Sequence, residues 1–213
     1  MVITIQAIFT GRPQPIQDDQ GVWLSAIFRS PVDGPILLEE RGLLGDHVAD
    51  TKHHGSLDQA VCCHPLAHYD YWRALYPANR LLAPGGVGEN WTIANGDEGD
   101  VCVGDVVRVG TAQIQVSGPR YPCWKQGRKL QIAGFQEQTM ATLRTGWYGR
   151  VLRPGRVQAN DPWQLEHRPH PQMTIWQLNH CLFDTFDPTF AQYALTIPEL
   201  SATWQLIFRR KLA

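Results

Sequence analysis

The run SGPRYPCWK at residues 117–125 places a single cysteine in a turn between cationic side chains. Cys123 lies three positions after Arg120 and two before Lys125. A thiol acts as a nucleophile or a metal ligand only in its thiolate form, and nearby positive charge lowers its pKa toward that form. Two prolines in the run fix φ, so the turn is stiff and the backbone sets the direction of the sulfur. These features predict that Cys123 is the centre of the chemistry.

A second polar cluster, Lys52-His53-His54-Gly55, follows a Gly-Asp-His triplet at residues 45–47. Its lysine and histidines offer up to three donors beside a glycine, whose backbone can approach a ligand closely. Each charge-assisted hydrogen bond contributes roughly 1.5–3 kcal/mol and micromolar affinity requires about 8 kcal/mol, so roughly three or four bonds would hold a phosphate or a polyoxo anion. The alternative is a solvated loop whose histidines only cap the ends of strands.

A zinc site is a weaker alternative. Cys62 and Cys63 lie just upstream of His64 and His68, and all four are side chains that zinc accepts. Structural zinc sites usually assemble from two knuckles, however, and the chain has no CxxC or HExxH motif. The sequence therefore gives little support to zinc.

A glycine-rich run, GGVGEN at residues 85–90, matches neither GxGxxG nor GxxxxGK[ST]. It predicts a tight turn that brings Glu89 and Asn90 toward a pocket. A nucleotide-binding fold is not supported, and the absence of GxSxG gives no support to a serine hydrolase.

The composition is that of an ordinary globular chain of 213 residues. Hydrophobic residues make up 43%, charged residues 18%, and the net charge is −1. Because positive charge is not concentrated anywhere, the chain is not expected to bind nucleic acid or a membrane surface. Five irregularly spaced cysteines do not form a disulfide framework, and no segment approaches the ~20 apolar residues of a membrane span. We therefore expect a cytoplasmic protein.

Residues 1–165 show short strand patterns separated by Gly and Pro turns, which is typical of a barrel or sandwich. The clearest hairpin joins residues 106–109 to 112–117 through a Gly-Thr pair that suits a type II′ turn. Two helices are predicted to interrupt the strands, over Pro65 to Tyr76 and over Gln126 to Leu143. The predicted fold class is mostly β.

Residues 166–213 predict a small C-terminal module of three helices. The first covers Thr174 to Phe183, and the second opens at Asp187-Pro188, an N-cap followed by Pro at the first helical position. The third is predicted to open at a capping box over Thr196 to Glu199. A module this small should pack on the barrel or on a partner. It is predicted to form a homodimer or to dock an electron donor, and the sequence leaves both open.

Five motifs together point to one known family. In order along the chain they are KHHGSLDQAV, GVGENWTI, GDVVRVG, VSGPRYPCWK and GWYGRVLRPG. Over nearly its whole length the chain resembles the MOSC domain, named for the C-terminal part of molybdenum cofactor sulfurase. It is most similar to the stand-alone bacterial branch that gives resistance to N-hydroxylated base analogues and carries a C-terminal three-helix module. The resemblance implies a MOSC-type β-barrel and a pyranopterin-dithiolene molybdenum cofactor.

The resemblance also implies an activity, the reduction of N-hydroxylated bases, hydroxylamines or amidoximes. It implies that Cys123 supplies a protein sulfur to the metal. Since the chain has no flavin, haem or iron–sulfur signature, the electrons would come from another protein, and the resemblance implies that this protein is a flavoprotein. Reduction of N–OH to N–H also consumes protons, and His53 or His54 is the candidate donor.

The residues expected to bind the cofactor come from the two polar clusters, the glycine-rich turn and one arginine further along the chain. They are Lys52, His53, His54, Gly55, Glu89, Asn90, Arg120, Cys123, Lys125 and Arg150. Four aromatic residues either stack a flat base or belong to the core, namely Tyr121, Trp124, Trp147 and Tyr148.

Two positions depart from the family pattern. Ser56 stands where the family loop commonly has a second glycine, and a positive φ there would cost about 1 kcal/mol. Trp91 replaces a smaller aliphatic residue and would either narrow the substrate mouth or fill the barrel.

Two other functions remain open at the level of sequence. One is a carrier that binds the molybdenum cofactor, or sulfur on Cys123, and passes it on without turnover. The other is a thiol or metal hydrolase in which Cys123 and His53 or His54 act as a dyad.

Overall fold

The computed structural model describes residues 2–213 and is mostly sheet, with 30% strand and 25% helix. Eight strands form the main sheet. From one edge to the other they are β13 (Gln164–His167), β9 (Val106–Val109), β10 (Ala112–Pro119), β11 (Trp147–Arg153), β7 (Val61–Pro65), β8 (Trp91–Ala94), β1 (Thr4–Thr10) and β4 (Ser30–Pro31). Strands β7 and β8 pair in parallel and the other neighbours pair antiparallel.

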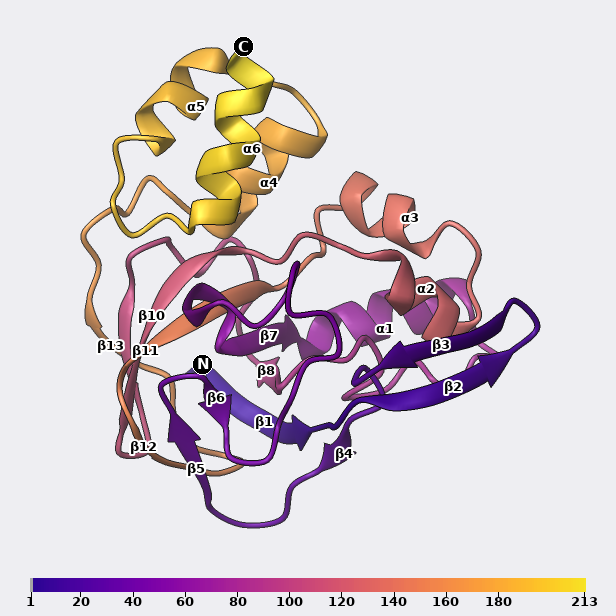
Figure 1. The fold of residues 1–213 in the computed structure, drawn as a ribbon. Coiled ribbons are helices and arrows are strands. Elements are labelled where there is room, and N and C mark those ends of the chain that lie inside the picture. The colour runs from indigo at the N-terminus through magenta and orange to yellow at the C-terminus, as the bar shows by residue number, and fades with distance from the viewer. Residues whose placement is uncertain (1) are drawn as a thin grey trace.

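The main sheet is curled into a half-barrel, which Figure 1 shows beneath the C-terminal helices. The curl brings β1 back toward the segment before β13, where the amide of Ile5 donates to the carbonyl of Asp161 at 3.0 Å. Apolar side chains fill the interior, and Trp91 and Trp147 are both fully buried there. The predicted mostly β, barrel-like fold is therefore confirmed.

Two smaller sheets flank the half-barrel. One consists of β12 (Gly155–Val157), β5 (Ile36–Glu39) and β6 (Gly42–Leu43), and the other is the hairpin of β2 (Gln14–Asp18) and β3 (Gly21–Ser25). Asp18 of β2 forms an ion pair with Arg128, which belongs to the helix α2 (Trp124–Leu130). This pair attaches the hairpin to α2.

The hairpin predicted around Gly110 is confirmed. Ala112 pairs with Val109, and Gly110 has a φ of +56°, which the first central position of a type II′ turn requires. Along β10, Ile114 and Val116 are buried in the barrel, as the alternating pattern of the sequence predicts.

The first predicted helix is confirmed as α1 (Leu66–Leu75), whereas the single helix predicted over residues 126–143 is wrong. That segment forms α2 (Trp124–Leu130) and α3 (Phe135–Ala141). Gln131 and Gly134 between them are left-handed, with φ of 57° and 67°. A left-handed residue ends a helix because its carbonyl can no longer continue the ladder.

The C-terminal helices are α4 (Ile175–Phe183), α5 (Pro188–Ala194) and α6 (Ala202–Leu212). The span predicted for the first helix matches α4, whose N-cap is Thr174, and Asp187 caps α5 as predicted. The predicted start of the third helix is wrong, because residues 196–200 form turns, such as Leu200 to Ile197, and the N-cap position of α6 is Ser201.

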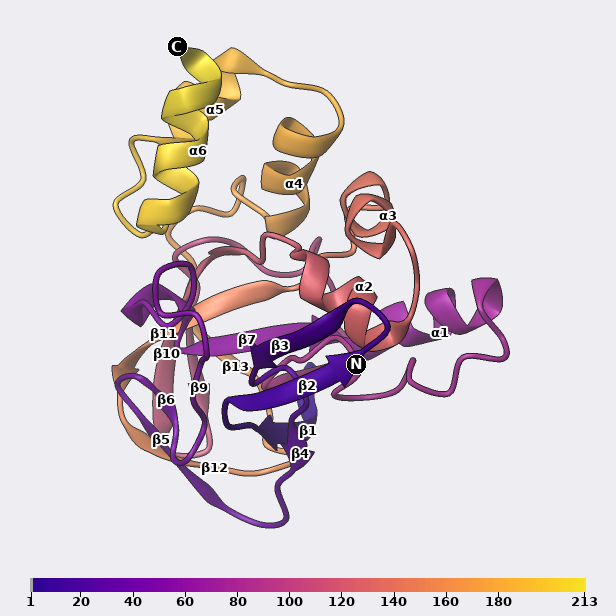
Figure 2. The same ribbon diagram turned by 45° about the vertical axis from the view of Figure 1, so that its right-hand side comes forward.

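Figures 1 and 2 show these three helices gathered at one end of the half-barrel, with α6 pointing its first turn toward the strands. The predicted boundary at residue 165 falls inside β13, and the division into two domains stays a prediction. Among residues 2–213, no helix combines the length and the apolar character that crossing a membrane needs.

Candidate functional site

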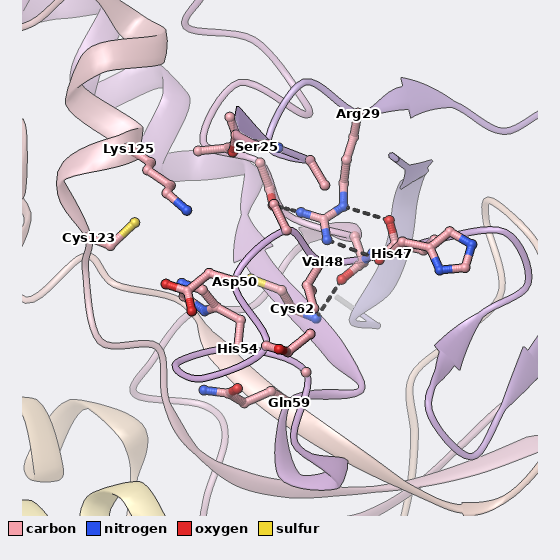
Figure 3. A pocket seen from close by; sticks show the side chains of 18 of the residues that line it. Ser25, Arg29, His47, Val48, Asp50, His54, Gln59, Cys62, Cys123 and Lys125 are labelled. Atoms are coloured by element: carbon pink, nitrogen blue, oxygen red, sulfur yellow. Dashed lines mark hydrogen bonds and ion pairs between the residues drawn. The ribbon is translucent and has the colours of Figure 1, made fainter. Parts of the chain in front are cut away.

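A cavity of about 320 Å³ opens between the loops at one end of the half-barrel. Its walls come from several separate segments of the chain, and Figure 3 shows most of them. The lining side chains are drawn from, but do not include every residue of, the stretches 25–29, 41–62, 88–90 and 120–125, and Tyr148 of β11 joins them. The two polar clusters singled out from the sequence therefore share one cavity.

Cys123 is half-buried in the cavity wall, at the N-cap of α2. Its backbone amide donates to Gln126 Oε1 at 3.3 Å, and the carbonyl of Pro122 accepts from Gln136 at 3.0 Å. These bonds hold the turn on both sides of the sulfur. In Figure 3 the sulfur and the ammonium group of Lys125 lie on the same side of the cavity.

Arg120 brings a buried positive charge to the same wall and is only 7% exposed. Its Nη2 donates to the carbonyl of Val87 at 2.8 Å, whereas its Nη1 has no partner among the described residues. Burial by itself would lower the pKa of Arg120, but the neighbouring Cys62 and Tyr148 outweigh burial and raise it. The guanidinium is therefore a permanent cation with a free donor, and such a donor costs roughly 1–3 kcal/mol until it is satisfied.

An ion pair that the sequence reasoning missed forms another wall. Arg29 and Asp46 pair through two contacts, Nε to Oδ1 at 3.1 Å and Nη2 to Oδ2 at 3.0 Å, and both side chains are about nine-tenths buried. Asp46 also accepts from the amide of Gly11 at 2.7 Å and from Asn90 Nδ2 at 2.9 Å. Asn90 in turn accepts from the amide of Cys62 at 3.1 Å. This network ties β1, β7 and the loops before β4 and β8 into one rigid wall.

His54 lies in the cavity and is held in its neutral form. Burial is the largest cause, followed by the positive charges of Arg120 and Lys125, and together they lower its pKa from 6.5 to about 4. Because the folded state disfavours protonation of His54, its contribution to stability is present above pH 6.5 and is lost as the pH falls toward 4.

We expect the His54 ring to stay neutral from pH 8 down to about pH 5 and to titrate near pH 4. Histidine NMR titration, assigned with His54→Gln, measures this directly. Lys125→Met should move the midpoint upward because it removes a nearby positive charge. A midpoint near the ordinary 6.5 would contradict the geometry described for this site.

Four of the residues expected to bind the cofactor do not line the cavity. Lys52 is exposed, and His53 is exposed and hydrogen-bonds Asp50 at 3.0 Å. Arg150 pairs with Asp58, away from the cavity lining. Glu89, the fourth, is fully buried behind the cavity wall.

The hydrogen bonds of Glu89 give this residue a structural role in the glycine-rich turn. Its Oε1 accepts from Tyr69 at 2.7 Å, from the amide of Gly85 at 2.7 Å and from Thr92 at 2.8 Å. These bonds shape the glycine-rich turn, which positions Gly88 and Asn90 at the cavity. The structure thus brings His54, Gly55, Asn90, Arg120, Cys123 and Lys125 together.

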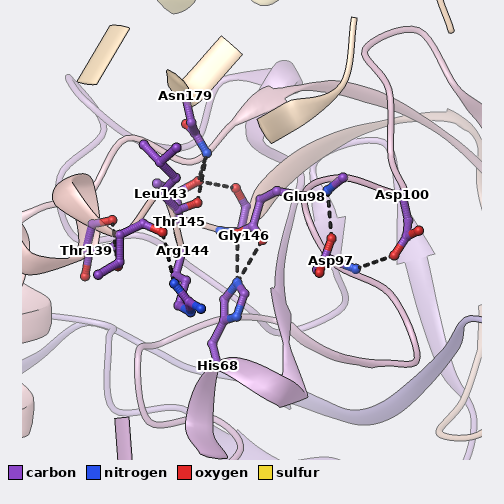
Figure 4. Close-up of polar contacts among 12 residues, drawn as sticks. His68, Asp97, Glu98, Asp100, Thr139, Leu143, Arg144, Thr145, Gly146 and Asn179 are labelled. Carbon is purple, nitrogen blue, oxygen red and sulfur yellow. Dashed lines mark hydrogen bonds and ion pairs between the residues drawn. The ribbon is translucent and has the colours of Figure 1, made fainter. Parts of the chain in front are cut away.

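The residues considered for zinc do not assemble into a metal site, and one of them, His68, is engaged by a carboxylate. Figure 4 shows His68 against Glu98, with Nε2 to Oε2 at 2.8 Å, and Glu98 also accepting from the amide of Gly146 at 2.6 Å. Within residues 2–213, no group of three or more His, Cys, Asp or Glu side chains is arranged to hold a metal ion. His64 is buried beside His68 with both ring nitrogens unpaired in the described structure.

The structure also shows where the two residues that depart from the family pattern and the four aromatic residues lie. Ser56 has a φ of −66° and is unstrained, because Gly55 takes the positive φ of 83°. Trp91 is fully buried in the barrel and fills its core. Trp147 is core as well, whereas Tyr148 lines the cavity. Tyr121 and Trp124 are 42% and 50% exposed at the surface.

Comparison with known proteins places this cavity in a family context. The MOSC domain family matches residues 50–164. "Protein YiiM" of Escherichia coli (strain K12) is 38% identical over 76% of this chain and 71% of its own length. A protein named "Reductase" of Gibberella moniliformis is 35% identical over 71% of this chain, which is 27% of that protein.

A solved structure shares the whole architecture. The crystal structure of YiiM from Geobacillus stearothermophilus superposes with a TM-score of 0.83 at 30% identity, covering 99% of this chain and 100% of that one. Similarity therefore extends beyond the matched domain to the C-terminal helices. The sheet, the cysteine-bearing turn and the match over residues 50–164 together show that this chain belongs to the MOSC domain family.

Proposed function

We propose that this protein binds a molybdenum–pyranopterin cofactor in the cavity and reduces N-hydroxylated compounds with electrons from a separate flavoprotein. The observation that carries the proposal is that the Cys123 thiol and the buried, partly unpaired guanidinium of Arg120 line one cavity. The family supports a molybdenum cofactor-related role, and the relative named "Reductase" supports an oxidoreductase.

The donor set of the cavity suits such a cofactor. A soft thiolate is the protein ligand that a sulfur-bound molybdenum centre favours, and Cys123 would supply it. Arg120 and Lys125 would bind the phosphate and oxo groups, with Arg29 contributing from another wall, since charge-assisted hydrogen bonds to phosphate are short and strong. The cavity wall contains more cationic than anionic side chains, so a bound anion would balance the excess positive charge.

When bound, the cofactor would supply the two-electron chemistry, and the protein would orient the substrate and deliver protons. The overall change is R–NHOH + 2e⁻ + 2H⁺ → R–NH₂ + H₂O. His54 is the one of the two neighbouring histidines that lines the cavity, whereas His53 does not line it and is paired with Asp50. We therefore assign proton delivery at the substrate oxygen to His54, which as a neutral ring can donate at one nitrogen and be reprotonated at the other.

The test is molybdenum analysis of protein made in a cofactor-competent host, followed by a single turnover with chemically reduced protein. We expect molybdenum to copurify and the N-hydroxylated substrate to be converted in proportion to it. Bound molybdenum without any product would favour the carrier instead. Ester or amide hydrolysis by metal-free protein would favour the hydrolase and would contradict the proposal.

A further inference from the structure

The first turn of α6 makes three hydrogen bonds to the half-barrel. The amide of Ala202 donates to Asp58 Oδ2 at 3.1 Å, and the amide of Ser201 donates to the carbonyl of Ser117 at 2.8 Å. The indole of Trp204 donates to the carbonyl of Pro119 at 2.7 Å. Figures 1 and 2 show this end of α6 directed at the strands.

These contacts involve two segments that contribute residues to the cavity wall. Asp58 belongs to the short 3-10 helix Leu57–Gln59, which directly follows the loop of His54 and includes a cavity-lining residue, Gln59. Pro119 immediately precedes Arg120 and begins the turn that carries Cys123. One helix end therefore touches the two segments that supply the imidazole and the thiol.

Asp58 is the centre of this junction. Its Oδ1 accepts from Arg150 Nε at 2.9 Å, and Arg150 Nη2 donates to the carbonyl of Glu199 at 2.9 Å. The hydroxyl of Ser117 donates to the carbonyl of Asp58 at 2.6 Å. Arg150, expected from the sequence to bind the cofactor, thus links the barrel to the residues before α6.

The coupling has a clear physical basis. The N-cap side chain of α6, Ser201, makes no capping hydrogen bond, so Asp58 satisfies a backbone N–H that the helix itself leaves free. Trp204 is 1% exposed and packs edge-on against Phe183, which packs in the same way against Tyr121, two residues before Cys123. Polar and apolar contacts reach the same turn.

We propose that the C-terminal helices position the cavity, with Asp58 and Trp204 as the positioning residues that hold the His54 segment and the Cys123 turn at a fixed separation. The inference rests on the proposed function only in assigning that cavity to the cofactor. In this proposal the helices act within a single chain. This role differs from the two roles predicted from the sequence, which were forming a dimer and docking an electron donor.

The test measures the reactivity of Cys123 in the full-length, metal-free chain with a water-soluble thiol reagent. The other four cysteines are at most 5% exposed, so native labelling reports Cys123, and Cys123→Ser confirms this. We expect Asp58→Ala and Trp204→Phe to change the labelling rate by about fivefold or more, a typical size for coupling between sites. Asp58→Asn, which keeps one acceptor oxygen, should fall between Asp58→Ala and the wild type.

Asp187→Ala is the matched control. Asp187 caps α5 within the same helices, and among residues 2–213 its carboxylate bonds only the amides of Thr189 and Phe190, so the variant weakens the helices without touching the junction. Hydrogen exchange should accelerate at residues 54–60 and 119–126 in the junction variants and stay unchanged there in the control. Equal labelling and exchange in all variants, or equal changes in the control, would overturn the inference. Because neither readout involves molybdenum, this outcome is independent of the reductase test.

Discussion

Replacing Cys123 with serine should lower molybdenum-dependent N-reduction at least about 100-fold, since even outer-shell partners of metal ligands contribute 10–100-fold. Serine keeps the shape of the side chain but replaces a soft sulfur with a hard hydroxyl. Cys123 is half-buried and lines the cavity, outside the apolar core, so the free energy of unfolding should change by less than about 0.5 kcal/mol. Elemental analysis and turnover on the same preparation measure both effects.

Serine variants of two other cysteines serve as controls for Cys123→Ser. Cys102 is buried away from the cavity, and its thiol donates to the carbonyl of Pro171 at 3.5 Å, so Cys102→Ser should retain molybdenum and activity. Cys62 shares the cavity, but burial raises its pKa and favours the thiol over the thiolate. If Cys62→Ser lost molybdenum while Cys123→Ser retained it fully, the metal ligand would be Cys62, and the assignment of Cys123 would be contradicted.

Much of the fold follows from local sequence, because the relevant interactions are local. The hairpin at Gly110 and the capped starts of α4 and α5 depend on residues within a few positions of one another. The prediction failed where a residue without a strong signal changed the backbone. Gln131 has a left-handed backbone and ends α2. Glycine and asparagine are the residues that usually indicate this conformation in a sequence, and glutamine does not.

The same contrast holds for the candidate site. Cys123, Arg120 and Lys125 are neighbours in one motif, and the structure brings them to the cavity that His54 also lines. Arg29 carried no signal, because it lies at the end of a loop and acquires its role from a partner 17 positions away.

Glu89 shows the opposite contrast. Its motif indicates a contact with a ligand, but its Oε1 accepts from the hydroxyl of Tyr69, 20 residues earlier, and the side chain does not line the cavity. Pairings between distant segments decide which polar residues remain free, and a single sequence does not display such pairings.

Replacing Asp46 with asparagine should destabilise the protein by about 3 kcal/mol, the lower end of what breaking a buried ion pair costs. The amide removes the charge that compensates Arg29, and one of its two ends must present N–H groups to a guanidinium that has only donors. For a chain of this size the melting temperature should fall by about 6–12 °C. Thermal melts and urea titrations measure the change.

The double variant Asp46→Asn/Arg29→Met separates lost charge pairing from lost packing. Because it leaves no unpaired guanidinium, it should be more stable than Asp46→Asn alone, whereas two independent losses would add. Additivity of the two single variants would contradict the ion-pair account.

The same pair of variants should move anion affinity in opposite directions, which no general loss of stability would produce. Arg29→Met removes a cation from the cavity wall and should weaken inorganic phosphate binding at least about tenfold, since a charge-assisted hydrogen bond contributes roughly 1.5–3 kcal/mol. Asp46→Asn removes the neighbouring negative charge and frees donors of Arg29, so folded protein should bind phosphate more tightly. Calorimetric titration of the metal-free chain, below the melting transition of each variant, measures both constants. Weaker binding in both variants would mean that Arg29 braces the wall without contributing its charge to the site.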